Sequence, residues 1–463
     1  MTLNQILKQL FEELDRTHPG GHADLNLVLT PHRLPNFTTT SSGAIRYFTD
    51  TTVQLTQSVA STLRINDKQG SSTVDEEVYR KVVRESVAEI HSLLSSKGES
   101  WSDQNAGQIK SDLKAEIAER LIGLTKQFKH YFPASTSGFG KHAAFVLGPV
   151  SLMNRELWLQ QVDFSEKAKA SYLNLPAENE RWKEAISSAM RSRDSSPDLQ
   201  GLASAIWPAI KRHGYMIGVT IEGKDRVLSR RLAEIVCRTA LDGLSLCFGD
   251  LGFFEHQVLA SERLPPGLNY SIVETDGALW GPGSYAGREI RDLRDDVLES
   301  VCKDYTDYFT HLGKILSAVV TPSNATHRLL SQRWTTSLNW YAEGARESNS
   351  AIALAKFGSS LDVLASGGKA NGITGMLENL LGCSRETEVV RGEKPRTLSA
   401  LVAEVYESGR SQILHGTHID QLKSFDEAKA YASQLARLAL LVAAERLMTF
   451  TGSDEEDKAF RSM

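Results

Sequence analysis

The sequence predicts a mixed α+β N-terminal region followed by an all-α antiparallel helical bundle. Two observations lead to this prediction. Helical and strand-like patterns alternate over the first 320 residues, whereas residues 321–450 show helical periodicity almost throughout. The chain has 463 residues, which is too long for one ordinary domain. Its apolar share of 41% and charged share of 24% are typical of a globular protein with real cores.

The N-terminal region contains both element types in turn. Helices are expected at residues 1–17, 74–96 and 109–128, and a polar, interrupted helical stretch at 178–213. Residues 18–72 are rich in Thr, Ser, Pro and Gly, so loops and short strands are expected there. Strands are expected at 143–152 and, most clearly, at 215–223, where a run of β-branched residues ends at Gly223. A helix is expected next at 228–246, followed by Gly- and Pro-rich loops and strands at 249–290.

The C-terminal region begins near Thr321-Pro322-Ser323-Asn324, a typical helix start or linker. Its expected helices span 327–346, 349–365, 375–381, 398–414 and 425–450, and a polar loop with Arg385, Arg391, Lys394 and Arg396 lies at 383–396. The predicted organisation is therefore a mixed α/β region at 1–320, with an internal boundary near 165–215, a bundle at 321–450 and a solvated acidic tail at 451–463.

Composition and charge exclude several classes of protein. The net charge is 52 − 57 = −5, so the chain as a whole is not a basic nucleic-acid binder. The four cysteines form no CxxC pair, which argues against a zinc ribbon. Cys237 and Cys247 fall in expected core helices and are predicted to be small buried side chains in a reducing compartment. The most apolar run, residues 438–444, is far shorter than the roughly 20 residues of a membrane span. With no apolar signal-peptide core near residue 1, a soluble, cytoplasmic protein without membrane partners is expected.

Familiar cofactor and metal motifs do not fit. The glycines of GPGSYAG (281–287) lack the dinucleotide-binding spacing, and SGFGKHAAF (137–145) lacks the hydroxyl residue that a P-loop places on Mg²⁺. His18 and His22 could share a helix face, but without nearby ordered carboxylates they are expected to be solvated polar residues. No cofactor and no metal site is therefore predicted.

The segment VYESGRSQILHGTHID (405–420) is the one that suggests chemistry. Arg410 offers a permanent, planar cation that suits a phosphate. His415, five positions later, titrates near neutrality and can move a proton. These two groups suffice for attack of an RNA 2′-hydroxyl on its own phosphate, because the substrate carries its own nucleophile.

The spacing does not place these two side chains on one helix face. Five residues of α-helix turn through about 500°, so Arg410 and His415 point about 140° apart. They converge only if Arg410 reaches around, if the helix unwinds at Gly416, or if a second copy of the motif faces the first. Ser411 and His415 are four residues apart and share a face. The competing interpretation is a surface arginine and a helix-capping histidine.

The context of this segment resembles the HEPN superfamily (higher eukaryotes and prokaryotes nucleotide-binding domain), and within it the ApeA-like branch. Tyr406, Arg410, Ser411, His415 and Gly416 fill the pattern of that branch on the third long helix of the bundle. Asp362, within SSLDVL (359–364), stands where the superfamily often has a glutamate. The resemblance covers residues 325–450.

The resemblance implies a metal-independent endoribonuclease that acts as a homodimer in anti-phage defence by abortive infection. Arg410 would stabilise the scissile phosphate, His415 would be the general acid and base, Ser411 would orient His415 or contact phosphate, and Asp362 would support them. The N-terminal region would respond to an unknown phage or cellular trigger. Two other hypotheses are a non-catalytic HEPN module for dimerisation or nucleotide binding, and an unrelated helical interaction protein.

Overall fold

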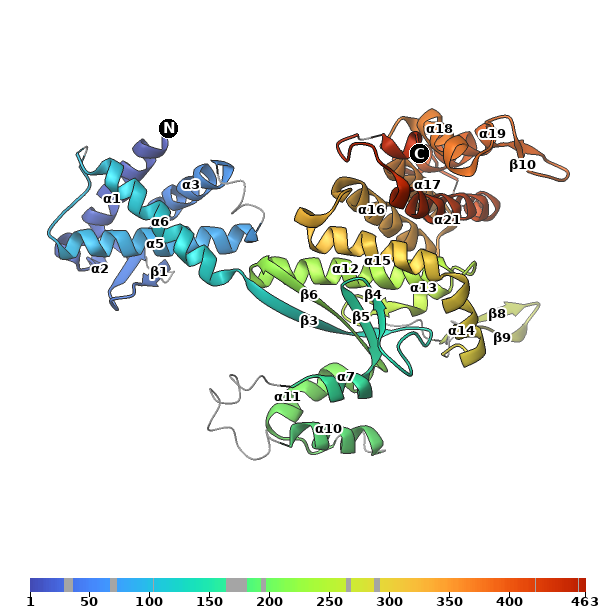
Figure 1. Cartoon of the computed structure of the whole chain (residues 1–463), viewed down its shortest axis with the longest axis horizontal. Coiled ribbons are helices and arrows are strands. Elements are labelled where there is room, and N and C mark those ends of the chain that lie inside the picture. Colours follow the sequence, from blue (N-terminus) through green and yellow to red (C-terminus); the bar gives the residue numbers. More distant parts are fainter. Residues whose placement is uncertain are drawn as a thin grey trace. The chain divides into compact units, whose positions relative to one another are not determined.

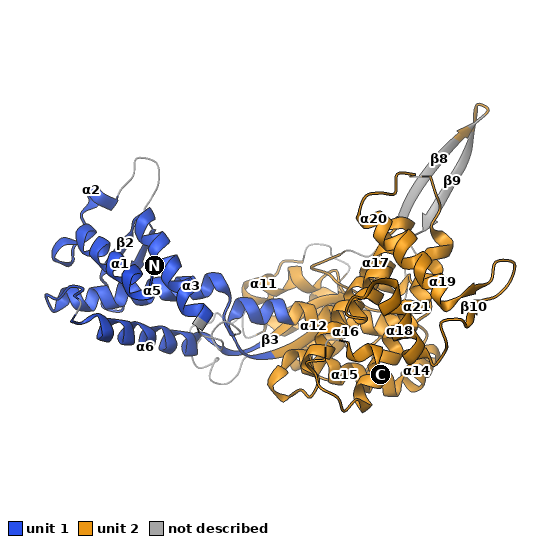
Figure 2. Cartoon of the chain, turned by 90° about the horizontal axis from the view of Figure 1, so that it is seen from above, with its two compact units in different colours: residues 1–128, 221–232 blue, residues 129–220, 233–463 orange. Residues whose placement is uncertain are grey.

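The computed structural model describes residues 1–28, 36–66, 73–102, 104–163, 181–192, 197–263, 268–286, 292–420, 422–456 and 458–463. The chain divides into two compact units (Figure 2). Unit 1 contains Met1–Phe128 and Ile221–Leu232, and unit 2 contains Lys129–Thr220 and Ala233–Met463. The division near residue 128 differs from the predicted boundary at 320, and the reason lies in contacts of the bundle described below.

Unit 1 is mainly helical. Its elements are α1 (Leu3–Thr17), η1 (Pro19–Gly21), α2 (Leu25–Val28), β1 (Asn36–Thr39), β2 (Ile45–Phe48), α3 (Asp50–Asn66), α5 (Glu76–Ser96) and α6 (Ala106–Leu124) (Figure 1). The Thr2 side chain caps α1 and the Gln5 side chain bonds back to the Thr2 amide, so both ends of a capping box are present. Apolar side chains of α1 at helical spacing, including Leu7, Leu10 and Leu14, are fully buried in one core with α3, α5 and α6.

Helix α3 is a correction to the sequence prediction, which expected loops and short strands over residues 18–72. The strands β1 and β2, which pair as an antiparallel hairpin, and the turn between them match that expectation, while residues 29–35 and 67–72 lie outside the described residues. The run 50–66 is rich in Thr and Ser, which are weak helix formers. It is nevertheless helical because Val59 and Ala60 are buried in the core, and hydroxyls such as that of Thr56 donate to the carbonyl four residues earlier (2.7 Å to Thr52 O).

His18 is also a correction, because it is buried rather than solvated. Its Nδ1 lies 3.1 Å from the Leu14 carbonyl oxygen, and its Nε2 accepts from the Tyr47 amide at 3.0 Å. Burial lowers the pKa of His18 to about 4. The neighbouring His91 is buried as well; it accepts from Arg46 Nε at 2.9 Å on one nitrogen and faces Asp15 at 3.0 Å on the other. His18 therefore belongs to a buried polar network.

Most of the elements that follow belong to unit 2, although residues 126–128 and 221–232 are part of unit 1. The five-stranded sheet has the order β4-β5-β6-β3-β7. Its strands are β3 (Lys126–Ser135), β4 (Phe145–Leu147), β5 (Val150–Asn154), β6 (Tyr215–Lys224) and β7 (Val258–Leu259), and the associated helices are α7 (Arg155–Gln161), α10 (Trp182–Arg191), α11 (Gly201–Ile210), α12 (Arg226–Leu246) and α13 (Phe253–His256). The strands predicted at 143–152 and 215–223 pair directly, with Leu152 opposite Ile217. Of the interrupted stretch 178–213, the helices begin at Trp182, while residues 178–180 and 193–196 lie outside the described residues.

Cysteines and the glycine motif behave as expected in the parts that the structure describes. Cys237, in α12, and Cys247, which directly follows it, are buried free thiols, and burial raises the pKa of both. The segment GPGSYAG falls mostly within β9 (Ala278–Ala286), which pairs antiparallel with β8 (Leu268–Thr275) as a hairpin. Gly281 and Gly283 are thus part of a strand rather than a turn that leads into a helix, and Gly287 lies outside the described residues.

The C-terminal region of unit 2 is helical. Its elements are α14 (Asp295–Asp304), α15 (Thr306–Val320), η2 (Pro322–Asn324), α16 (Arg328–Ala345), α17 (Ser350–Leu364), α18 (Lys369–Leu381), β10 (Glu388–Val390), β11 (Arg396–Thr397), α19 (Leu398–Ala403), η3 (Glu404–Ser411), α20 (Gln412–Leu414), α21 (Asp426–Thr449) and η4 (Ala459–Arg461). Helices α16, α17 and α21 pack together, and the fully buried Trp334 donates its Nε1–H to the Leu440 carbonyl at 2.9 Å.

The bundle and the sheet region share one unit because buried polar contacts join them. Arg346, at the end of α16, pairs with Asp242 in α12, and both side chains are almost fully buried. Arg437 of α21 donates to the carbonyls of Leu246 and Cys247, each at 2.8 Å. Helix α15, placed before the predicted boundary, packs on α16 and α21. Residue 320 is therefore a helix end rather than the division between the two compact units.

The last residues are docked on the bundle, in contrast to the predicted solvated tail. The Asp454 carboxylate accepts from the amides of Leu329 and Leu330, at 2.8 and 3.0 Å, and so caps the start of α16. Phe460 is buried, and Arg461 donates to three successive carbonyls, of residues 365–367, just after α17. Within the acidic run, Asp454 thus makes a structural contact, whereas Glu455 and Glu456 are exposed, as the predicted solvated tail requires. Residue 457 lies outside the described residues.

Candidate functional site

The predicted helix over 398–414 has an unusual middle. Residues 398–403 are α-helical, residues 404–411 form the π-helix η3, and residues 412–414 return to α-helix. π-Helical turns are rare and are frequent at functional sites, because the extra residue per turn re-aims the side chains. Arg410 and Ser411 lie at the end of this segment, so their directions differ from those of a straight α-helix.

Two glycines bring η3 close to α17. A Cβ on Gly409 would lie 2.7 Å from Leu354 Cδ2, and a Cβ on Gly358 would lie 2.8 Å from Arg410 Cβ. Neither position has room for a larger side chain. Sequence reasoning did not single out these glycines; their signal is that each interrupts an otherwise helical pattern, which often marks a close backbone approach.

Arg410 is held by two of the residues that the sequence pattern indicated. Its Nη1 donates to the Tyr406 hydroxyl at 3.0 Å, and the guanidinium carbon lies 5.1 Å from the centre of the Tyr406 ring. Its Nη2 lies 3.1 Å from Asp362 Oδ2 on α17. The side chains of Arg410 and Asp362 are 25% and 16% exposed, so the pair is partly shielded but reachable from solvent.

The Arg410–Asp362 pair leaves polar atoms unused. Arg410 Nε and Asp362 Oδ1 are both buried and have no hydrogen-bond partner among the described residues. A guanidinium can donate along its Nε–Nη2 edge to two oxygens of one carboxylate or phosphate. A buried group without a partner is costly, but only Nε is unpaired here, because Nη2 faces Asp362; a bidentate acceptor would have to displace the Asp362 carboxylate.

Ser411 and His415 lie apart from this pair. The His415 amide donates to the Ser411 carbonyl at 3.0 Å, and the helix ends where Gly416 adopts a left-handed φ of 68°. The His415 side chain is exposed and Ser411 is half-buried. Within the described part of the chain, no hydrogen bond or ion pair joins His415 to Arg410. The side chains of Ser411 and His415 are likewise not joined by a hydrogen bond among the described residues. One chain thus brings together Arg410, Tyr406 and Asp362. The side chain of His415, five residues after Arg410, is exposed on the surface and does not join them.

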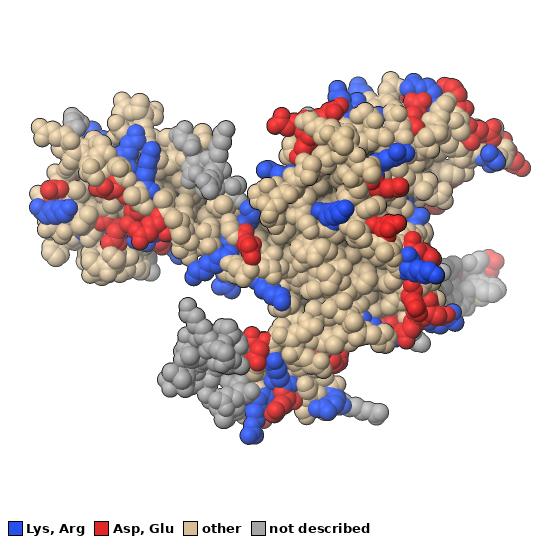
Figure 3. Space-filling model, in the orientation of Figure 1, with Lys and Arg blue, Asp and Glu red and all other residues tan. Residues whose placement is uncertain are grey.

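The basic loop predicted at 383–396 is largely neutralised. It contains the β10–β11 hairpin, and Arg385 pairs with Glu378 at 3.0 Å. Arg396 pairs with both Glu404 (2.9 Å) and Glu427 (3.0 Å). On the face drawn in Figure 3, basic and acidic side chains are interspersed over the helical part of unit 2. The exposed Arg391 and Lys394 therefore supply most of the hairpin's free positive charge.

The described residues contain no group of three or more His, Cys, Asp or Glu side chains arranged to hold a metal ion. None of their helices combines the length and the apolar character that crossing a bilayer requires. Comparisons of the chain with protein-family models, with curated proteins and with solved structures give no match.

Proposed function

We propose that this chain is an endoribonuclease of the HEPN type whose reacting groups are Arg410 and His415. The observation that carries the proposal is the arginine held by Tyr406 and Asp362, whose Nε donor has no partner among the described residues. The HEPN resemblance indicates the same three residues. A partly shielded cation that exchanges Asp362 for a phosphate suits one scissile phosphate better than a long nucleic acid.

The proposed reaction is a transesterification within the RNA. The 2′-oxygen forms a bond to the adjacent phosphorus while the bond from phosphorus to the 5′-oxygen breaks. His415 takes the proton of the 2′-hydroxyl, and a protonated His415 returns one to the leaving oxygen. Arg410 stabilises the charge on the phosphate oxygens. The products end in a 2′,3′-cyclic phosphate and a 5′-hydroxyl, and the chemistry needs no metal ion because the substrate supplies the nucleophile.

A homodimer would complete the site, because within one chain His415 is exposed and no hydrogen bond or ion pair among the described residues joins it to Arg410. Three exposed apolar side chains lie close to His415 in sequence: Leu414 (57% exposed), Ile419 (88%) and Leu422 (96%). Exposed apolar groups concentrated in one segment favour a protein contact. We propose that a second copy covers this segment, that the role is anti-phage defence, and that residues 1–320 restrain the activity until a trigger binds.

A specific observation favours the alternative of a non-catalytic HEPN module. Arg410 already has an ion pair with Asp362, which competes with phosphate for the same guanidinium. In that case the bundle would serve dimerisation or nucleotide binding, and Arg410 would have only a structural role.

The test compares RNA cleavage in EDTA by the wild type, Arg410→Ala and His415→Ala. Matched controls are Arg446→Ala, an exposed arginine of α21, and His418→Ala, whose ring lies edge-on to Phe425 in the same loop. We expect both site variants to lose at least 100-fold in rate, both controls to stay active, and the product to carry a 2′,3′-cyclic phosphate. Equal cleavage by His415→Ala and wild type, or a strict metal requirement, would overturn the proposal; RNA binding without cleavage under all conditions would favour the alternative.

A further inference from the structure

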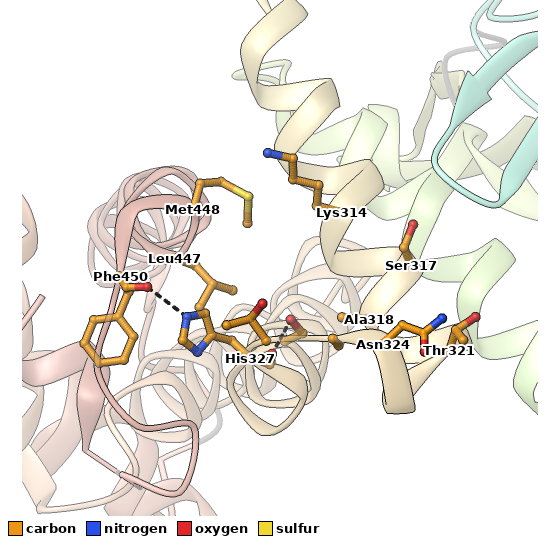
Figure 4. A pocket seen from close by; sticks show the side chains of 12 residues that line it. Lys314, Ser317, Ala318, Thr321, Asn324, His327, Leu447, Met448 and Phe450 are labelled. Atoms are coloured by element: carbon orange, nitrogen blue, oxygen red, sulfur yellow. Dashed lines mark hydrogen bonds between the residues drawn. The ribbon is translucent and has the colours of Figure 1, made fainter.

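A second candidate site is a cavity of about 560 Å³ in the bundle, which shares no residue with the Arg410 site. Figure 4 shows its walls: Lys314 and Ser317 from α15 on one side, Leu447 and Met448 from α21 on the other, and His327 between them. This volume is within the range of about 300–1,000 Å³ that small-molecule sites occupy. The cavity therefore has the size of a ligand site.

The end of the cavity around His327 is fixed by hydrogen bonds. His327 lies 2.8 Å, through Nε2, from the Phe450 carbonyl, and the two rings lie 5.3 Å apart. Because the carbonyl can only accept, Nε2 carries the proton. The Ser331 hydroxyl donates to the His327 carbonyl at 2.7 Å, and Asp454 caps the same helix start. These contacts hold the walls in place without a ligand, as in most preformed binding sites.

The charge of the cavity is a single positive group. Among the described residues that line the cavity, Lys314 is the one Lys or Arg, and none is Asp or Glu. Over the residues that the structure describes, no carboxylate lies within ion-pair distance of Lys314. One ammonium balances one negative charge, so the cavity suits a monoanion better than a polyphosphate.

The remaining walls favour a partly apolar ligand. Ala318, Leu447 and Met448 offer an apolar surface, and Met adapts to ligands of different shape. The hydroxyls of Ser317 and Thr321 add polar contacts. A second cavity, of about 510 Å³, shares Lys314 and Ser317 and is lined by aromatic side chains including Phe145 and Phe309. Lys314 thus stands between two surfaces that can take an apolar body.

We propose that this cavity binds a small organic monoanion, with its acidic group on Lys314 and its apolar body against Leu447 and Met448. The inference goes beyond the proposed ribonuclease activity and does not depend on it. The ligand class follows from one unpaired ammonium beside an apolar wall, which is the arrangement that discriminates a carboxylate or sulfonate from its neutral analogue.

The experiment uses the full chain and 1-anilinonaphthalene-8-sulfonate, a monoanion with an aromatic body, followed by fluorescence titration. Naphthalene-2-acetate and its neutral amide are the competitors. The variants are Lys314→Met, which removes the charge, and Ala318→Phe, which fills the cavity. Lys114→Met, on the exposed face of α6, is the matched control.

We expect the wild type to bind the probe and the acid to displace it at least fivefold better than the amide. Lys314→Met should weaken probe binding five- to tenfold and remove the preference for the acid, while Lys114→Met binds as the wild type does. Ala318→Phe should abolish displaceable binding with circular dichroism unchanged. Equal competition by the acid and the amide in the wild type, or unchanged probe affinity in Lys314→Met, would overturn the proposal. Because Lys314 is exposed, the Lys314→Met variant is expected to fold normally.

Discussion

Replacing Gly358 with alanine tests the close contact between α17 and η3. The added Cβ would lie 2.8 Å from Arg410 Cβ, about 0.7 Å inside the usual carbon–carbon separation of about 3.5 Å. Overpacking of this kind costs roughly 1–3 kcal/mol. Replacing glycine with alanine inside a helix returns about 1 kcal/mol. The expected net effect on the free energy of unfolding is a loss of up to about 2 kcal/mol.

The matched control is Gly375→Ala in α18, where the added Cβ would meet nothing within 4 Å. It should raise the stability by about 1 kcal/mol. Both variants are measured by urea unfolding and, in the same preparations, by cleavage of RNA. Because the backbone of η3 must shift to admit the Gly358→Ala methyl group, Arg410 should leave its 3.1 Å position beside Asp362, and the rate should fall at least tenfold only in that variant.

Two outcomes would refute this reasoning. If Gly358→Ala stabilised the protein as much as Gly375→Ala, the space between α17 and η3 would be larger than the structure indicates. If Gly358→Ala were destabilised but cleaved RNA at the wild-type rate, the position of Arg410 would not matter for the reaction, and the proposed role of Arg410 would fail with it.

Three further predictions concern stability. Asp242→Asn should destabilise unit 2 by about 3–5 kcal/mol, because it leaves the buried Arg346 without its main counter-charge. The control Asp296→Asn, in an exposed pair with Arg294, should cost less than about 1 kcal/mol. Equal losses of unfolding free energy in chemical unfolding would contradict the burial of the Arg346–Asp242 pair. Lowering the pH from about 6.5 to about 4 should lower the free energy of unfolding of unit 1 by at most about 3 kcal/mol. The reason is that the unfolded state binds a proton at His18, whereas the folded state, in which the pKa of His18 is lowered to about 4, keeps the ring neutral and accepting from the Tyr47 amide. A His18→Gln variant whose hydrogen exchange in α1 shows the same pH dependence would argue against this cause. Phe460→Ala should lower the free energy of unfolding by about 3–5 kcal/mol, because the buried Phe460 ring packs the C-terminal segment on the bundle. A thermal midpoint unchanged from wild type would show instead that this segment is a free tail.

Much of the helical region could be predicted from the sequence because its signals are local. Apolar residues recur at helical spacing, so the helices expected at 327–346, 349–365 and 425–450 end within a few residues of α16, α17 and α21. The strand at 215–223 was equally plain from its β-branched residues. Helix α3 was missed because its sequence favours loops and only burial against the rest of unit 1 makes it helical.

The sequence by itself indicated which residues are proposed to carry chemistry, namely Arg410, Ser411, His415 and the acidic Asp362, and it showed no familiar nucleotide-binding motif. Only the tertiary structure decided which of them meet. Arg410 reaches Asp362 across two helices because Gly358 and Gly409 let η3 approach α17, and helix geometry alone places His415 elsewhere. The same holds for the domain boundary and the C-terminal segment, since buried pairs such as Arg346–Asp242 join residues about 100 positions apart, and no local pattern contains that information.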